Sequence, residues 1–213
     1  MSIQKSYPYI LIIGSIIGLL ASFVLTVDTI KFIENPNVDV LCNINPFISC
    51  TSVASEWQSY IFGFPNSLLG IVAFSMLFAM GIMLYFGGPD SSILDKISGQ
   101  NKARKPLWCL VNLGTAFAMI FVMWFVYESV YVINSLCLYC MMVWAVTWPI
   151  FLYTTIWNFK EANFSIIKVK PGNFASKVLA VISKNHIQIL ILWYVVIIFL
   201  ILFQFKDFFF ASF

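Results

Sequence analysis

The chain has 213 residues, of which 61% are apolar and only 10% are charged, and its formal net charge is +3. A soluble domain has roughly 45–50% apolar and about 25% charged residues. The composition therefore excludes a disordered chain, a soluble enzyme with an ordinary polar surface and a nucleic-acid-binding protein with a basic face. It indicates a membrane protein.

Five apolar runs are long enough to cross about 30 Å of hydrocarbon, which takes about 20 helical residues. In chain order they are residues 9–27, 67–86, 107–127, the uncharged stretch 129–159, and 187–205. Backbone in lipid must satisfy its own hydrogen bonds, and runs of this length do so as helices. We predict an all-α integral membrane protein, with five transmembrane helices in a single domain of residues 1–213. The first run is too long for the core of a cleaved signal peptide and is expected to stay as an anchor.

The basic residues predict how the chain is oriented. Ten of the twelve Lys and Arg residues fall on one side of the predicted spans, and only Lys31 and Lys206 fall on the other. Lys and Arg accumulate in cytoplasmic loops. We therefore expect a multi-pass plasma-membrane protein with its N-terminus in the cytoplasm and its C-terminus outside. The basic loops would also attract anionic membrane lipid, and we expect no nucleic-acid partner.

This topology places four of the five cysteines at the outer face, where disulfides form and persist. Cys42 and Cys50 lie in the loop between the first two spans. A disulfide between them would contribute about 2.5 kcal/mol through loop entropy, so this pair fits a structural bond as well as an exchanging one. Cys109 begins the third span at the opposite face, and we expect it to be a small packing residue.

Cys137 and Cys140 form a Cys-x-x-Cys motif where the fourth span enters from the outside. Either Asn134 or Ser135 could cap this helix and place Cys137 in its first turn, where unpaired N–H groups favour a thiolate. Cys140 would lie about 4.5 Å deeper, facing the apolar bundle. A bond across one helical turn stabilises little, which favours redox cycling over a static staple.

A tetrathiolate zinc site is the other arrangement that four cysteines allow. The seven-residue gap between the loop cysteines exceeds the usual spacing of zinc ligands, and one member of the second pair lies inside the membrane. We predict no metal site.

The rest of the outer loop has an amphipathic pattern. Apolar residues at helical spacing alternate with polar ones, the apolar set being Val53, Ala54, Trp57, Tyr60 and Ile61 and the polar set Ser52, Ser55, Glu56 and Ser59. This pattern predicts a short helix at the membrane interface. Asn66, at the mouth of the second span, fits both an N-cap of that helix and a ligand contact.

These residues resemble the vitamin K epoxide reductase family. The matching pieces are Cys42 with Ser49 and Cys50, Val53, the Phe62-Gly63 pair, the segment 65–70 that opens the second span, and the motif 137–140. The resemblance covers roughly residues 9–157, about two-thirds of the chain. It implies a four-helix transmembrane bundle around a quinone pocket, with the helix at 187–205 as an additional fifth.

The resemblance also implies a role for each cysteine. Cys42 would take electrons from a reduced thioredoxin-like protein and form a disulfide with Cys50. Cys50 would exchange with Cys137, and Cys140 would face a quinone, which could be ubiquinone, menaquinone or a related vitamin K-type quinone. Asn66 matches the asparagine that hydrogen-bonds a quinone carbonyl in relatives.

Two departures from the family pattern concern the quinone contacts. Trp144 stands where animal members have a tyrosine, and it can donate one hydrogen bond and stack. Glu56 stands where a serine is expected, with Ser55 one position early. Many prokaryotic members carry a fused thioredoxin-like domain, whereas this chain is expected to use a separate partner protein.

We therefore predict a membrane thiol-disulfide oxidoreductase that supports disulfide formation outside the cytoplasm. Thiolate exchange and a quinone as electron sink suffice for this chemistry. The alternatives are vitamin K epoxide reduction, which Trp144 and the lack of a C-terminal retention signal make less favoured, and a non-catalytic membrane protein whose disulfides brace a loop.

Overall fold

The computed structural model describes residues 3–35, 40, 42–44, 47–87, 101–160 and 174–206. The five predicted spans are confirmed, as Ser6–Glu34, Asn66–Phe86, Pro106–Val132, Leu138–Lys160 and His186–Gln204. The elements, in order, are α1 (Ile3–Glu34), α2 (Cys50–Ala54), η1 (Trp57–Tyr60), α3 (Asn66–Gly87), α5 (Asn101–Tyr127), η2 (Glu128–Val132), α6 (Leu138–Lys160), α7 (Phe174–Lys184) and α8 (His186–Gln204). The described part of the chain is thus an all-helical bundle.

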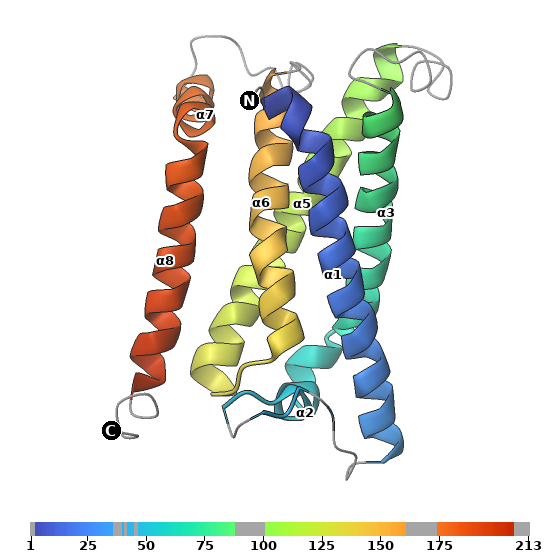
Figure 1. Cartoon of the computed structure of the whole chain (residues 1–213), viewed down its shortest axis with the longest axis vertical. Coiled ribbons are helices and arrows are strands. Elements are labelled where there is room, and N and C mark those ends of the chain that lie inside the picture. The colour runs from blue at the N-terminus through green and yellow to red at the C-terminus, as the bar shows by residue number, and fades with distance from the viewer. Residues whose placement is uncertain are drawn as a thin grey trace.

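Four helices, α1, α3, α5 and α6, run side by side along the length of the molecule (Figure 1). α1 packs along both α3 and α6, and α6 packs on α5, whereas α3 and α5 make little direct contact. Small residues permit the close approach of α1 and α3. A Cβ added at Gly18 would lie 2.5 Å from ring atoms of Phe74, and one added at Gly70 would meet the Ser22 hydroxyl. Such small-residue contacts are typical of helix packing in membranes.

The third span is longer than its sequence pattern predicts. α5 continues into the π-helical turn η2, so that residues 129–132 belong to the third span and the fourth begins only at Leu138. The uncharged stretch 129–159 therefore contains a helix end, a loop and a new helix. Asn134 turns the chain with a left-handed backbone, φ 53°, a conformation that Asn adopts more readily than most residues. Hydropathy carries no signal of this turn because the loop has no charge.

The predicted single amphipathic helix of the outer loop is wrong in detail. The segment forms two short pieces, α2 and η1, which are separated at Ser55 and Glu56. Val53 and Ala54 are buried as expected, but Trp57 is 66% exposed and the polar Gln58 is only 2% exposed. The Ser59 hydroxyl donates to the Val53 carbonyl, 2.6 Å away, and this bond folds η1 back onto α2.

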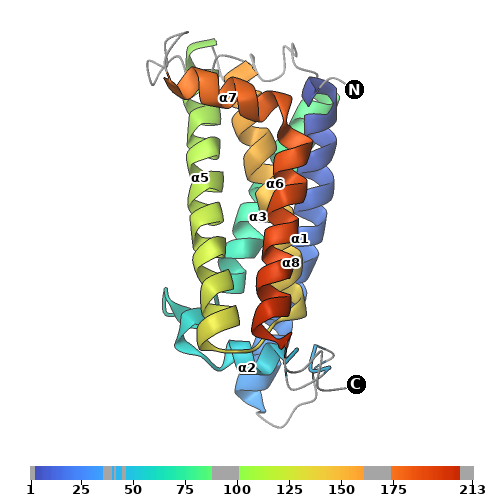
Figure 2. The same ribbon diagram turned by 90° about the vertical axis from the view of Figure 1, so that its left-hand side faces the viewer.

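The ends of the bundle differ in what they carry. α2 lies at the end where α1 and α5 finish and α6 begins, while Cys109 lies near the start of α5 at the other end (Figure 1). α7 lies across that second end, and α8 returns along the outside of the bundle (Figure 2). The segments 88–100 and 161–173, which hold three of the ten basic residues on the predicted inner side, lie outside the described residues.

Candidate redox site

A disulfide joins Cys42 to Cys50, the first residue of α2, with their Cα atoms 5.5 Å apart. Ser49 caps α2, since its hydroxyl accepts the Ser52 N–H at 3.2 Å. The side-chain Oδ1 of Asn43 accepts a hydrogen bond from the Ser49 hydroxyl at 3.0 Å. These local bonds hold the loop against the start of the helix, and Cys42 is completely buried there. A thiol of another protein can reach Cys42 only if its covering residues move.

A short parallel bridge brings the second cysteine motif to this disulfide. Ile48 pairs with Leu136. The Ser49 N–H donates to the Leu136 carbonyl at 2.9 Å, and the Leu136 N–H donates to the Phe47 carbonyl at 2.7 Å. The bridge therefore ties together the residues immediately before Cys50 and immediately before Cys137, although the two cysteines are 87 positions apart.

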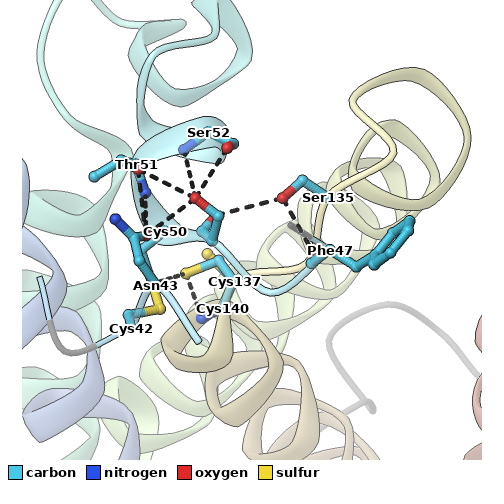
Figure 3. Close-up of a disulfide and its surroundings, with 10 residues drawn as sticks. Cys42, Asn43, Phe47, Cys50, Thr51, Ser52, Ser135, Cys137 and Cys140 are labelled. Atoms are coloured by element: carbon cyan, nitrogen blue, oxygen red, sulfur yellow. Dashed lines mark hydrogen bonds between the residues drawn. A yellow bond between two sulfur atoms is a disulfide. The ribbon is translucent and has the colours of Figure 1, made fainter. Parts of the chain in front are cut away.

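The bridge places the sulfurs within reach of one another (Figure 3). The Sγ atoms of Cys50 and Cys137 are 3.1 Å apart, and the Sγ atoms of Cys42, Cys50 and Cys137 all lie within 4.8 Å of one another. Disulfide exchange proceeds by attack of a thiolate on a disulfide sulfur. The arrangement allows Cys137 to exchange with the loop disulfide at Cys50 without a rearrangement of the backbone.

Cys137 is the N-cap residue of α6. α6 begins at Leu138, the Cys137 carbonyl accepts the Met141 N–H at 2.9 Å, and the Cys137 Sγ accepts the Cys140 N–H at 3.3 Å. The predicted capping by Asn134 or Ser135 is therefore wrong. The Ser135 hydroxyl is directed at the Phe47 and Ser49 carbonyls instead, at 3.4 and 3.5 Å, because the bridge sets the position of this loop.

The surroundings of Cys137 favour its thiolate. The hydrogen bond from the Cys140 thiol lowers the pKa of Cys137 most, and the backbone N–H groups of Cys140 and Tyr139 lower it further. Burial opposes this shift, since the side chain is fully buried. The net direction is a pKa below the ordinary value, as expected for a sulfur at a helix N-terminus.

A cavity of about 400 Å³ lies inside the bundle next to the sulfurs, and residues of α1, α3, α5 and α6 line it. Cys50 and Cys140 line it, as do the predicted cofactor contacts Asn66 and Trp144, and nearly all of its other lining is apolar. Cys137 is not part of the lining. Cys140 is therefore the cysteine of the second motif that faces the cavity, while Cys137 faces the loop disulfide.

Asn66 begins α3, and its side chain does not cap the helix. Its Nδ2 donates to the Gln58 carbonyl at 2.7 Å, while its Oδ1 is buried and has no hydrogen-bond partner among the described residues. The N-cap role predicted for Asn66 is thus wrong, and its position in the cavity wall leaves the ligand-contact role open. Sequence reasoning missed Gln58, whose Nε2 donates to Glu128 Oε2 at 3.1 Å. A single Gln in a polar pattern carries no signal of such a contact.

Comparison with known proteins decides the family. The model of the vitamin K epoxide reductase family matches residues 9–155. The chain belongs to this family. No curated protein matches the chain. Proteins of the vitamin K epoxide reductase family are oxidoreductases that act on thiols and disulfides and on quinones. The matched residues include the four core helices, both cysteine pairs and the cavity, whereas α7 and α8 lie beyond them.

Membership of the vitamin K epoxide reductase family bears on two further predicted positions. The Ser55 hydroxyl donates to the Ser52 carbonyl at 2.9 Å and does not line the cavity, and Glu56 does not line it either. Ser59 is the serine of this segment that does.

Zinc ligation by the clustered sulfurs would need the loop disulfide to be reduced, because a disulfide sulfur is not a thiolate.

Proposed function

We propose that this protein oxidises the dithiol of a separate thioredoxin-like protein outside the cytoplasm and passes two electrons to a membrane quinone. The observation that carries the proposal is the 3.1 Å separation of the Cys50 and Cys137 sulfurs, with Cys140 on the cavity side of the same motif. This placement gives a continuous route from the loop disulfide to the cavity. The proposed site is at the extracytoplasmic face of the plasma membrane.

The partner dithiol reduces the Cys42–Cys50 disulfide and leaves as a disulfide. The Cys50 thiolate then attacks a Cys137–Cys140 disulfide at Cys137 and releases the Cys140 thiolate. Cys42 attacks Cys50, which restores the loop disulfide and leaves Cys137 and Cys140 reduced. The sulfurs in the structure have the distribution that follows this exchange, with the loop pair bonded and the helix pair free.

The cavity suits a hydrophobic electron acceptor. A quinone supplies the terminal two-electron acceptor and leaves as quinol after it takes up two protons. Asn66 would hold it through the second hydrogen of its Nδ2 amide, and the unpartnered Oδ1 would accept a quinol hydroxyl. Trp144, only 4% exposed and one helical turn beyond Cys140, would pack against the ring. Because α3 and α5 make little contact, the proposed route for a hydrophobic acceptor from lipid into the cavity runs between these two helices.

The decisive experiment replaces Cys140 and measures quinone reduction by a reduced thioredoxin-like protein. Cys140→Ala should abolish quinone reduction, since the remaining sulfurs cannot close the helix pair. Cys109→Ala is the matched control, because Cys109 is also a free cysteine but lies near the start of α5, at the other end of the bundle. Undiminished turnover in Cys140→Ala would reject the proposed relay, as would the same loss in both variants.

A trapping experiment tests the order of the relay. In the double variant Cys42→Ala with Cys140→Ala, Cys50 and Cys137 have both lost the cysteine that would resolve a disulfide between them, so the Cys50–Cys137 disulfide should accumulate under mild oxidation. Peptide mapping by mass spectrometry identifies this bond. An equal yield of a Cys50–Cys140 disulfide in the variant Cys42→Ala with Cys137→Ala would contradict the proposed order.

A further inference from the structure

α8 touches the bundle at few places, and one of them is the redox site. Most of its large apolar side chains are exposed, including Phe199 at 64% and Phe203 at 60%. Two apolar side chains of this segment are buried instead. Ile197, within α8, is 8% exposed, and Phe205, directly after α8, is only 5% exposed. Both belong to the same buried cluster as the four cysteines of the site. This cluster lies at the end of the bundle that carries α2 (Figure 1).

The last residue of α8 holds the turn that precedes the Cys-x-x-Cys motif. Gln204 Nε2 donates to Asn134 Oδ1 at 3.0 Å, and Asn134 Nδ2 is directed at the Val132 carbonyl at 3.4 Å. Asn134 is the described non-glycine residue with positive φ. Its side chain is thus held from both sides at the point where the chain leaves η2 and turns toward Cys137. A residue in this conformation depends on its surroundings to keep it there.

Phe205, which follows α8 directly, contacts the other side of the bridge. Its ring packs edge-on against the Phe47 ring, with centroids 5.7 Å apart and planes at 78°. The Phe47 carbonyl in turn accepts the Leu136 N–H of the bridge. Figure 3 shows Phe47 beside Ser135, with the Phe47 ring pointing away from the disulfide. The end of α8 therefore contacts both segments that the bridge joins, one through Gln204 and one through Phe205.

We infer that the end of α8 positions Cys137 against Cys50. Gln204 and Phe205 are positioning residues, which act through the Asn134 turn and the Phe47 segment and do not touch the sulfurs. Their effect is to raise the effective concentration of one sulfur at the other. The inference rests on the proposed relay for its biological meaning. The positioning itself can be measured as the tendency of Cys50 and Cys137 to form a disulfide, whether or not the relay operates.

The experiment measures that effective concentration directly. The full chain is prepared with Cys42, Cys109 and Cys140 replaced by serine, so that Cys50 and Cys137 are the remaining thiols. It is equilibrated with mixtures of reduced and oxidised glutathione, and the fraction of Cys50–Cys137 disulfide gives the effective concentration. Gln204→Ala with Phe205→Ala should lower this value by about tenfold, the size expected for the loss of one aromatic contact and one hydrogen bond. Phe205→Ala alone should also lower the effective concentration. Phe205→Trp, which keeps an aromatic ring, should lower it much less.

Phe203→Ala is the matched control, because this exposed phenylalanine lies on the same turn of α8 and is not in the buried cluster. It should leave the effective concentration unchanged. Gln204→Ala alone removes a partly exposed side chain, and it is the variant used if the double replacement does not fold. An effective concentration that is unchanged in Gln204→Ala, or lowered equally in Phe203→Ala, overturns the inference. Quinone turnover that persists in Cys140→Ala would reject the relay but leave this result standing.

Discussion

The contact between Gln58 and Glu128 offers a quantitative test of how the cavity wall is held. Gln58 is 2% exposed, and its Nε2 donates to Glu128 Oε2 at 3.1 Å. Its backbone carbonyl accepts the Asn66 amide at 2.7 Å. The η1 segment is therefore tied to η2 by the Gln58 side chain and to the start of α3 by the Gln58 backbone. Loosening the first contact should disturb the second.

The expected magnitudes follow from these bonds. A hydrogen bond to a charged group contributes about 1.5–3 kcal/mol and one between neutral groups about 0.5–1.5 kcal/mol. Gln58→Leu removes the bond to Glu128, and we expect it to lower the free energy of unfolding by about 2 kcal/mol. If the displaced carbonyl no longer holds Asn66, quinone affinity should fall by about fivefold, which corresponds to about 1 kcal/mol.

A double-mutant cycle separates this indirect effect from a general loss of stability. Quinone binding to detergent-solubilised protein is measured for Gln58→Leu, Asn66→Ala and the double variant. Since both replacements act on one contact, their effects should be non-additive by at least 0.5 kcal/mol. Ser55→Ala is the control, because its hydroxyl bonds within α2 and does not line the cavity. Additive effects, or unchanged affinity in Gln58→Leu, would refute the reasoning.

Two further predictions concern the sulfurs and the helix packing. Cys140→Ala should raise the pKa of Cys137, since it removes the thiol hydrogen bond that lowers it most; the pH profile of Cys137 alkylation, followed by mass spectrometry, should shift to higher pH, and an unchanged profile would contradict the assigned cause. Gly18→Ala should cost about 1–3 kcal/mol because its Cβ would overlap the Phe74 ring. Thermal unfolding in detergent measures this cost, and Gly114→Ala, whose Cβ would have open space within 4 Å, should be nearly neutral.

The sequence predicts the spans of this fold well but not the breaks between them. The lengths of the apolar runs are set by the thickness of the bilayer, so hydropathy finds each of them. The break at 133–137 depends on the left-handed turn at Asn134 and on the bridge from Ile48 to Leu136. Both depend on contacts with segments far away in the sequence, which a local pattern does not contain. The split of the outer helix at Ser55 has the same origin, since Ser59 bonds back to α2.

The sequence predicts those parts of the candidate site where the residue type itself indicates the chemistry. Cysteine spacing indicates two pairs, and the charge pattern predicts that they share one face. The pattern could not show that the Cys137 sulfur accepts the Cys140 N–H, nor that Gln58 is buried. The first feature arises because Cys137 lies at the start of α6, and the second arises from the tertiary contact of Gln58 with Glu128. Cys is not a typical N-cap residue, and Gln is not a typical buried residue.

The geometry also explains why the proposed relay needs four sulfurs and not two. Cys140 faces the cavity and Cys42 is buried in the loop, so neither is placed to exchange with the other. Cys137 contacts Cys50 at 3.1 Å and accepts hydrogen bonds from Cys140. In the proposed relay it is therefore the sulfur through which every electron pair passes between the two disulfides. A lowered pKa suits this position, because Cys137 leaves as a thiolate when Cys42 attacks Cys50 and restores the loop disulfide. Placing it outside the cavity lining keeps that thiolate away from the acceptor, so that Cys140 is the member of the pair that meets it.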